Sequence, residues 1–146
     1  MPSTYDIRVR CNAPQEKVFG LVADASTWSK WAGPTIRYSG WEREGDPAPG
    51  GVGAIRRLGS KQFSTREEIT EYDAPHYLAY TILTKSPLRD YRAIVSIDKD
   101  GDGCRITWAA TAEGRFPGAA PAMMFVLSRV VRGFATRLAR YAETTA

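Results

Sequence analysis

The stretch that most constrains the fold is residues 119–141, which has the apolar spacing of one long amphipathic helix. At about 3.6 residues per turn, six apolar residues at alternating three- and four-residue steps form one stripe: Met124, Leu127, Val131, Phe134, Leu138 and Tyr141. Arginines occupy the other faces, and Pro121 suits a first helical turn, where its missing N–H costs nothing. Such a helix must bury its stripe against another element. A sheet is expected to cover it, because most of residues 34–113 reads as strand.

Period-two alternation of apolar and polar residues predicts an antiparallel sheet. Residues 5–11 read as the first strand and residues 35–44 as the second, with two short helices between them that begin at Pro14 and Asp24. Five further strands follow at hairpin spacing: residues 52–60, 62–72, 77–85, 91–98 and 104–112. The sequence therefore predicts an α+β fold in which a curved seven-stranded antiparallel sheet wraps around the long C-terminal helix.

Three tryptophans in the N-terminal third leave alternatives open. Trp28 and Trp31, three residues apart, share one face of the second short helix and either pack in the core or contact a ligand. Trp41 falls on the opposite parity from Ile36 and Tyr38. It therefore needs either a bulge in its strand or an outward orientation.

The length and composition suit one domain that spans residues 1–146. The chain is 43% hydrophobic and 25% charged, which is ordinary for a globular protein. No window reaches the run of about 18 apolar residues that a membrane span needs, and the N-terminus lacks the apolar core of a secretion signal. We therefore expect a cytoplasmic protein without stable membrane insertion. The net charge of +4 comes from dispersed basic residues without interleaved aromatic residues, so we expect no nucleic-acid partner.

The cysteines and the single histidine carry no recognisable reactive site. Cys11 and Cys104 lie at the end of the first predicted strand and at the start of the last, and we expect buried free thiols there rather than a functional disulfide. Because no Cys-x-x-Cys pair or His/Cys cluster is present, we expect no metal and no cofactor. His76 follows Pro75 in a predicted turn, without a nucleophile assignable to it, so nucleophilic catalysis has little support.

Three charged residues fall on the inward face of the predicted sheet. With Leu58 inward, period two also turns Arg56 inward, and Ile69 does the same for Glu67 and Glu71. A buried arginine between two carboxylates is either a satisfied ion cluster or a binding site for a ligand carboxylate, phenolate or enolate. In the second case a carboxylate whose pKa is raised by burial serves as general acid or base. The three residues are therefore the catalytic candidates, and both alternatives stay open.

Aromatic and apolar residues complete the predicted ligand-binding surface. Beside the three charged residues, six others are candidates for contact with a ligand: Tyr80, Tyr91, Trp108, Phe116, Met124 and Leu127. Inward tyrosine hydroxyls can orient a ligand, an indole can stack on it, and methionine supplies adaptable apolar surface. Core filling accounts for the same residues equally well.

Motifs along the whole chain resemble one family. They are Ala13-Pro14 with Val18-Phe19, Asp24 with Trp28 and Trp31, the run Gly51-Val52-Gly53-Ala54-Ile55-Arg56-Arg57, the turn Glu71-Tyr72-Asp73-Ala74-Pro75-His76-Tyr77-Leu78-Ala79-Tyr80, and Gly103-Cys104-Arg105-Ile106-Thr107-Trp108. On these motifs and the order of its elements, the sequence resembles the START-like (SRPBCC) superfamily. Within it, the chain is similar to small bacterial proteins of the polyketide cyclase/dehydratase and lipid-transport type. The resemblance implies the helix-grip fold, and the Rieske cluster and iron ligands of the ring-hydroxylase members have no counterpart here.

The resemblance and the predicted aromatic cavity favour the binding of a small hydrophobic ligand, such as a lipid, a polyketide or another aromatic, between sheet and helix. The alternative is a polyketide cyclase/dehydratase in which Arg56 polarises a carbonyl and a carboxylate moves the proton. A third hypothesis is an interaction or stress-related module whose core is filled by its own side chains. The sequence leaves open whether the protein is a monomer or a homodimer.

Overall fold

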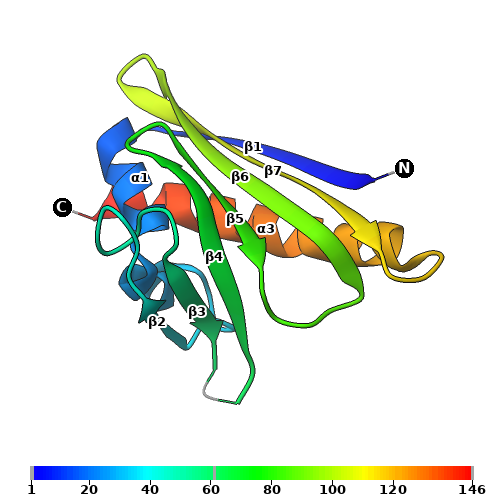
Figure 1. The fold of residues 1–146 in the computed structure, drawn as a ribbon. Helices are drawn as coiled ribbons and strands as arrows, with labels where there is room; N and C mark the ends of the chain where they lie inside the picture. Colours follow the sequence, from blue (N-terminus) through cyan, green and yellow to red (C-terminus); the bar gives the residue numbers. More distant parts are fainter. Residues whose placement is uncertain (1, 61, 146) are drawn as a thin grey trace.

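Seven antiparallel strands form one curved sheet, and one long helix lies across its inner face (Figure 1). The computed structural model describes residues 2–60 and 62–145. The strands are β1 (Ser3–Cys11), β2 (Tyr38–Arg43), β3 (Ile55–Gly59), β4 (Ser64–Asp73), β5 (Tyr77–Ile82), β6 (Leu88–Asp100) and β7 (Gly103–Gly114). The helices are α1 (Gln15–Ala23), the 3₁₀ turn η1 (Ala25–Thr27), α2 (Trp28–Trp31) and α3 (Ala119–Thr144). The predicted helix-grip fold is confirmed.

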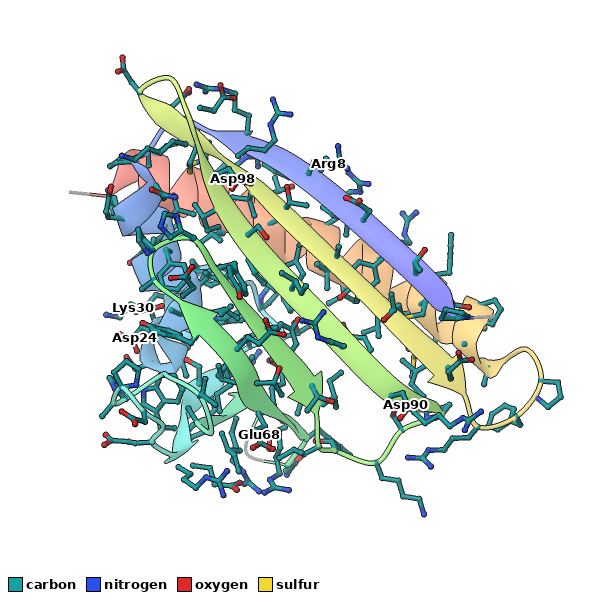
Figure 2. The ribbon with its side chains drawn as sticks, turned by 45° about the horizontal axis from the view of Figure 1, so that its top comes forward. Arg8, Asp24, Lys30, Glu68, Asp90 and Asp98 are labelled. Carbon is teal, nitrogen blue, oxygen red and sulfur yellow. The ribbon has the colours of Figure 1, made fainter. Side chains whose placement is uncertain are left out.

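The sheet is a meander that the first strand completes. Its strand order is β1-β7-β6-β5-β4-β3-β2, so β1 pairs with the last strand and all other neighbours are consecutive in sequence. Ile7 is buried on the inner face, whereas Arg8 and Asp98 stand on the outer face, away from α3 (Figure 2). The β1–β7 register places Cys11 directly opposite Cys104, and both are buried free thiols, as expected.

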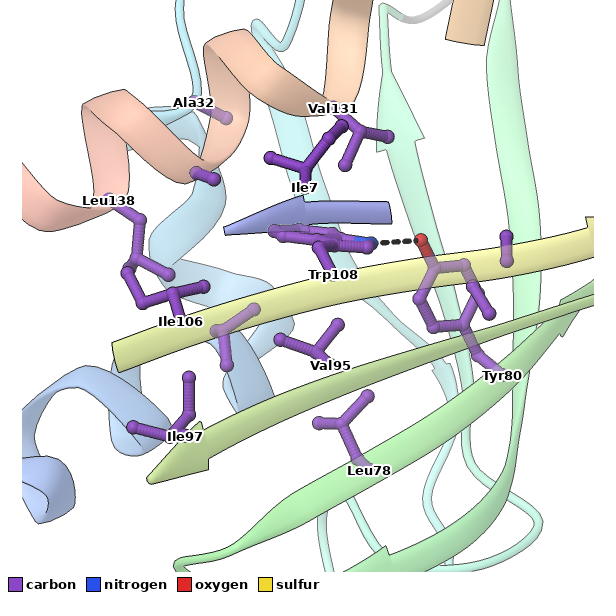
Figure 3. Packing of buried hydrophobic residues seen from close by; sticks show 14 of the residues in the cluster. Ile7, Ala32, Leu78, Tyr80, Val95, Ile97, Ile106, Trp108, Val131 and Leu138 are labelled. Atoms are coloured by element: carbon purple, nitrogen blue, oxygen red, sulfur yellow. Dashed lines mark hydrogen bonds between the residues drawn. The ribbon is translucent and has the colours of Figure 1, made fainter. Parts of the chain in front are cut away.

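α3 is held by the burial of its apolar stripe. Met124, Val131 and Leu138 are buried, while Leu127, Phe134 and Tyr141 are half-buried against the same core. Figure 3 shows Val131 and Leu138 directed towards core residues of the sheet. No side chain caps the start of α3, so packing stabilises it, at about 1.5–3 kcal/mol for each fully buried large aliphatic side chain. Among the described helices, none is long and apolar enough to cross a membrane.

The two short helices bring a pair of tryptophans into the core. Asp24 starts η1, because its carboxylate accepts a hydrogen bond from the Ser26 N–H at 3.0 Å. The ring centroids of Trp28 and Trp31 lie 4.6 Å apart, and the Trp28 ring meets the Trp108 ring edge-on at 5.8 Å. Both tryptophans of the short helix are buried, so of the two alternatives they follow the core-packing one.

The β2–β3 register determines the orientation of Trp41, which lies opposite the inward-facing Arg56 in an unbroken run of pairs that begins at Tyr38. The register between β2 and β3 shifts between Trp41 and Arg43. Trp41 is half-buried and packs against the edge of the core. Gly50 lies beside it, and a Cβ at that position would approach the indole to 2.9 Å. The bulge therefore follows Trp41 and does not re-aim it. Tyr38, which is 44% exposed, is the residue on the outer face, so neither of the two sequence alternatives holds.

Candidate functional site

A cavity of about 350 Å³ lies between the inner face of the sheet and the middle of α3. Strands β3, β4, β5 and β6 form its floor, and about two turns of α3 form its roof. The residues that line it are Thr35, Ile36, Leu58, Gly59, Phe63, Thr65, Glu67, Tyr80, Ile82, Tyr91, Leu127, Val130, Val131 and Phe134. The lining is mainly apolar, and its polar groups converge on the sheet side.

A buried ion pair lies at the polar side of the cavity. Arg56 on β3 and Glu67 on β4 are direct partners in the strand register. The Arg56 Nε donates to Glu67 Oε1 at 2.9 Å, and the Arg56 side chain has no exposed surface. The Glu67 side chain keeps 10% of its surface exposed, and it is Glu67 that lines the cavity. Glu67 therefore stands between Arg56 and any bound molecule.

The rest of the Arg56 guanidinium is enclosed by backbone and aromatic rings. Its Nη1 donates to the Val22 carbonyl at 3.0 Å. Its central carbon lies 4.8 Å from the centroid of the Trp28 ring and 4.9 Å from that of Tyr80, which are cation–π distances. Nη2 has no hydrogen-bond partner among the described residues. The two ring faces are what compensates the charge at that nitrogen.

Tyrosine hydroxyls form a second polar group beside Glu67. The Trp108 indole N–H donates to the Tyr80 hydroxyl at 3.0 Å (Figure 3). The Tyr91 hydroxyl forms a hydrogen bond with the hydroxyl of Tyr5 on β1. Tyr80 and Tyr91 line the cavity, whereas Trp108 is fully buried behind them. Tyr80 and Tyr91 therefore present hydroxyl groups to the cavity that can both donate and accept hydrogen bonds.

Burial determines the protonation states of Glu67 and of the tyrosines beside it. It raises the pKa of the Glu67 carboxyl, and the Arg56 guanidinium opposes part of that rise. It also raises the pKa of the phenols of Tyr80, Tyr5 and Tyr91 above the ordinary value. The phenols therefore stay protonated around neutral pH and remain hydrogen-bond donors.

The structure places seven of the nine candidate residues in the cavity lining or directly behind it. Four of them line the cavity: Glu67, Tyr80, Tyr91 and Leu127. Arg56, Trp108 and Met124 are buried behind this lining and fill the core. The inward phase predicted for Arg56 and Glu67 is observed, but only Glu67 is accessible from the cavity. Among the described residues, no group of three or more His, Cys, Asp or Glu side chains could hold a metal ion.

Glu71 does not face the cavity, which corrects the predicted inward phase. The register between β4 and β5 shifts between Ile69 and Glu71, and this bulge reverses the alternation of the strand. Glu71 lies instead on the outer face, where it pairs with Arg92 and accepts a hydrogen bond from the Tyr77 hydroxyl at 3.2 Å. The Arg92 hydrogen bond, with that from Tyr77, holds the pKa of Glu71 below its ordinary value.

Phe116 also lies outside the cavity. It belongs to the loop between β7 and α3 and is 59% exposed. With Met123, Val126 and Pro87 it lines a separate, shallow apolar groove at the start of α3. Phe116, a candidate for ligand contact, therefore does not line the inner cavity.

Several lining residues were outside the predicted site. Leu58 and Ile82 carry the alternation signal and could have been included on that ground. Thr65 and Val130 have no such signal, because one is polar and the other lies beside the apolar stripe of α3. Phe63 lies in the β3–β4 hairpin and reaches the mouth of the cavity.

Comparisons with known proteins agree with this architecture. Residues 4–143 match the model of the family described as polyketide cyclase/dehydrase and lipid transport. A START superfamily protein from Mycobacterium smegmatis superposes with a TM-score of 0.77 at 15% identity, covering 96% of this chain and 97% of that one. A solution structure from Thermobifida fusca gives a TM-score of 0.74 at 24% identity, covering 98% and 97%. No curated protein matches the sequence. The chain therefore has the fold of START-like proteins, and it belongs to the family described as polyketide cyclase/dehydrase and lipid transport.

Proposed function

We propose that the protein binds a small, largely apolar molecule in the cavity between the sheet and α3. The observation that carries this proposal is the unfilled volume of about 350 Å³ between the sheet and α3. It falls within the range of about 300–1,000 Å³ that is usual for small-molecule sites. Its lining also has the usual composition of such sites, with many apolar side chains and a few convergent polar groups.

The family supports a ligand of this class, since its description includes lipid transport. The sequence hypotheses of a lipid, a polyketide or another aromatic all remain ligands of the proposed cavity. Aromatic molecules have additional support from the rings of Tyr80, Tyr91 and Phe134 in the lining.

Binding has more geometric support than the two alternative functions. In the cyclase/dehydratase alternative Arg56 polarises a substrate carbonyl, yet Arg56 has no exposed surface and its Nε and Nη1 are already engaged. The filled-core alternative requires side chains to occupy the gap under α3, where the cavity lies instead. We therefore place ligand binding first.

Native mass spectrometry of freshly purified protein tests the proposal, followed by extraction of any bound molecule and a thermal-shift screen of lipids and aromatic polyketides. Thr65→Trp is designed to fill the cavity, because Thr65 is half-buried in its lining. Thr111→Trp is the matched control, since it makes the same substitution at an exposed position of β7. Ligand retention by wild type and Thr111→Trp, together with its loss in Thr65→Trp, supports the proposal. An apo mass combined with no thermal shift across the screen refutes it.

A further inference from the structure

The described residues that line the cavity include one charged side chain, Glu67, and no cation. Arg56 balances the charge of Glu67 but has no exposed surface. An anionic ligand group in the cavity would therefore meet the Glu67 carboxylate before any guanidinium. Desolvating a charge without a direct partner is costly, so this arrangement disfavours a carboxylate on the ligand.

Glu67 also has unused capacity to accept a hydrogen bond. Its Oε1 accepts from the Arg56 Nε, while the carboxylate has two oxygens with about four acceptor positions. The exposed tenth of this side chain lies in the cavity lining. A ligand hydroxyl that donates to Glu67 would make a charge-assisted hydrogen bond, which is stronger than a bond between neutral groups.

The tyrosines can donate a hydrogen bond to the oxygen of a ligand hydroxyl that itself donates to Glu67. Tyr80 and Tyr91 line the same cavity as Glu67, and their hydroxyls can donate as well as accept. A hydroxyl on the ligand could then donate to the carboxylate and accept from a phenol at once. An ammonium group can donate to the carboxylate but accepts nothing from a phenol, and its charge would be desolvated beside an ion pair that Arg56 already neutralises.

Building on the proposed function, we propose that this cavity selects neutral ligands that carry a phenolic or alcoholic hydroxyl, with Glu67 as the acceptor that determines the selection. Carboxylates of the same carbon skeleton, such as free fatty or aromatic acids, are excluded. This assigns a ligand class to the proposed cavity and gives Glu67 a role that is distinct from catalysis.

Four naphthalene probes of one skeleton test this selection: naphthalene, 2-naphthol, 2-naphthoic acid and 2-naphthylmethylamine. Their affinities are measured by isothermal titration calorimetry at about pH 8, where Glu67 is more fully ionised than at lower pH. We expect 2-naphthol to bind wild type at least about tenfold more tightly than each of the other three, as one charge-assisted hydrogen bond allows.

Glu67→Gln removes the negative charge and should abolish the discrimination against 2-naphthoic acid. Glu68→Gln is the matched control, because Glu68 is the next residue of β4 and pairs with Arg43 on the surface. It should keep the wild-type order of affinities. If Glu67→Gln fails to fold, the double variant Arg56→Met with Glu67→Leu removes both charges, and the preference for 2-naphthol over naphthalene should disappear in it.

The outcomes distinguish a failure of the hydroxyl selection from a failure of the binding function. Binding of naphthalene without a gain for 2-naphthol, or binding of the acid or the amine as tightly as 2-naphthol, overturns the hydroxyl selection and leaves an apolar binding site. No binding of any probe, together with an apo protein from native mass spectrometry, overturns the binding function and this inference with it.

Discussion

Separating the two charges of the buried ion pair should cost more stability than removing both. In Glu67→Leu, the fully buried Arg56 guanidinium keeps only the Val22 carbonyl as an acceptor, and it cannot lose its proton. Breaking a buried pair on one side costs about 3–5 kcal/mol of the free energy of unfolding. Replacing both members by apolar residues of similar volume is often neutral or stabilising. We therefore expect Arg56→Met with Glu67→Leu to be at least about 2 kcal/mol more stable than Glu67→Leu alone.

The other single variant should behave differently, because a carboxyl can be neutralised. In Arg56→Met, Glu67 loses the guanidinium that lowers its pKa, so its pKa rises further above the value in the unfolded chain. The folded state then holds a proton that the unfolded state releases, and stability falls as pH rises. Arg56→Met should therefore be closer to wild type at about pH 5 than at about pH 8. The deficit of Glu67→Leu should not follow this trend.

Urea unfolding, followed by tryptophan fluorescence and circular dichroism at both pH values, measures all three variants. Glu68→Leu is the surface control, since its ion pair with Arg43 is exposed and is worth about 0–1 kcal/mol. If Glu67→Leu is as stable as wild type, or if the double variant loses the sum of the two single losses, Arg56 and Glu67 are not a coupled buried pair.

Three further predictions concern the core, the thiols and the outer face. Trp108→Ala should lower the free energy of unfolding by about 3–5 kcal/mol in the same assay, because the indole is fully buried; a loss below about 1 kcal/mol would contradict its place in the core. Burial raises the pKa of Cys104 to about 12 and also raises that of Cys11. Mass spectrometry should therefore find neither thiol alkylated in the folded protein and both alkylated in urea. Rapid alkylation of the folded protein would refute this. A hydrogen bond from Arg66 is the main cause that lowers the pKa of Glu42 to about 2. This stabilisation is present above the ordinary carboxyl pKa, so the Tm deficit of Glu42→Gln should shrink as pH falls from about 4 to about 2, and a constant deficit would contradict it.

Most of the fold could be predicted from the sequence because two periodicities dominate it. The stripe of α3 requires a large apolar partner, and the alternation in strands such as β1 identifies the inner face that supplies it. The same alternation correctly turned Arg56 and Glu67 inward, since β3 and the first half of β4 pair without a shift in register.

The site was less predictable, because it depends on register shifts and on small differences in packing. The bulge after Ile69 sends Glu71 to the outer face, and no residue type in that run marks the shift. Whether an inward side chain lines a cavity or fills the core is a matter of volume between elements, which alternation does not encode. Trp108 and Met124 fill the core for this reason, while Thr65 lines the cavity.

A methyl NMR titration of the labelled protein with 2-naphthol tests the binding cavity most directly. Leu58 on β3, Ile82 on β5 and Leu127 on α3 line the cavity from three elements that are distant in sequence. Ile94 on β6 lies in a hollow at the outer face and serves as the internal reference. We predict saturable shifts of the three cavity methyl groups with a common dissociation constant and no shift at Ile94. Shifts confined to Ile94, or no saturable shift at the cavity residues, would contradict a ligand site between the sheet and α3.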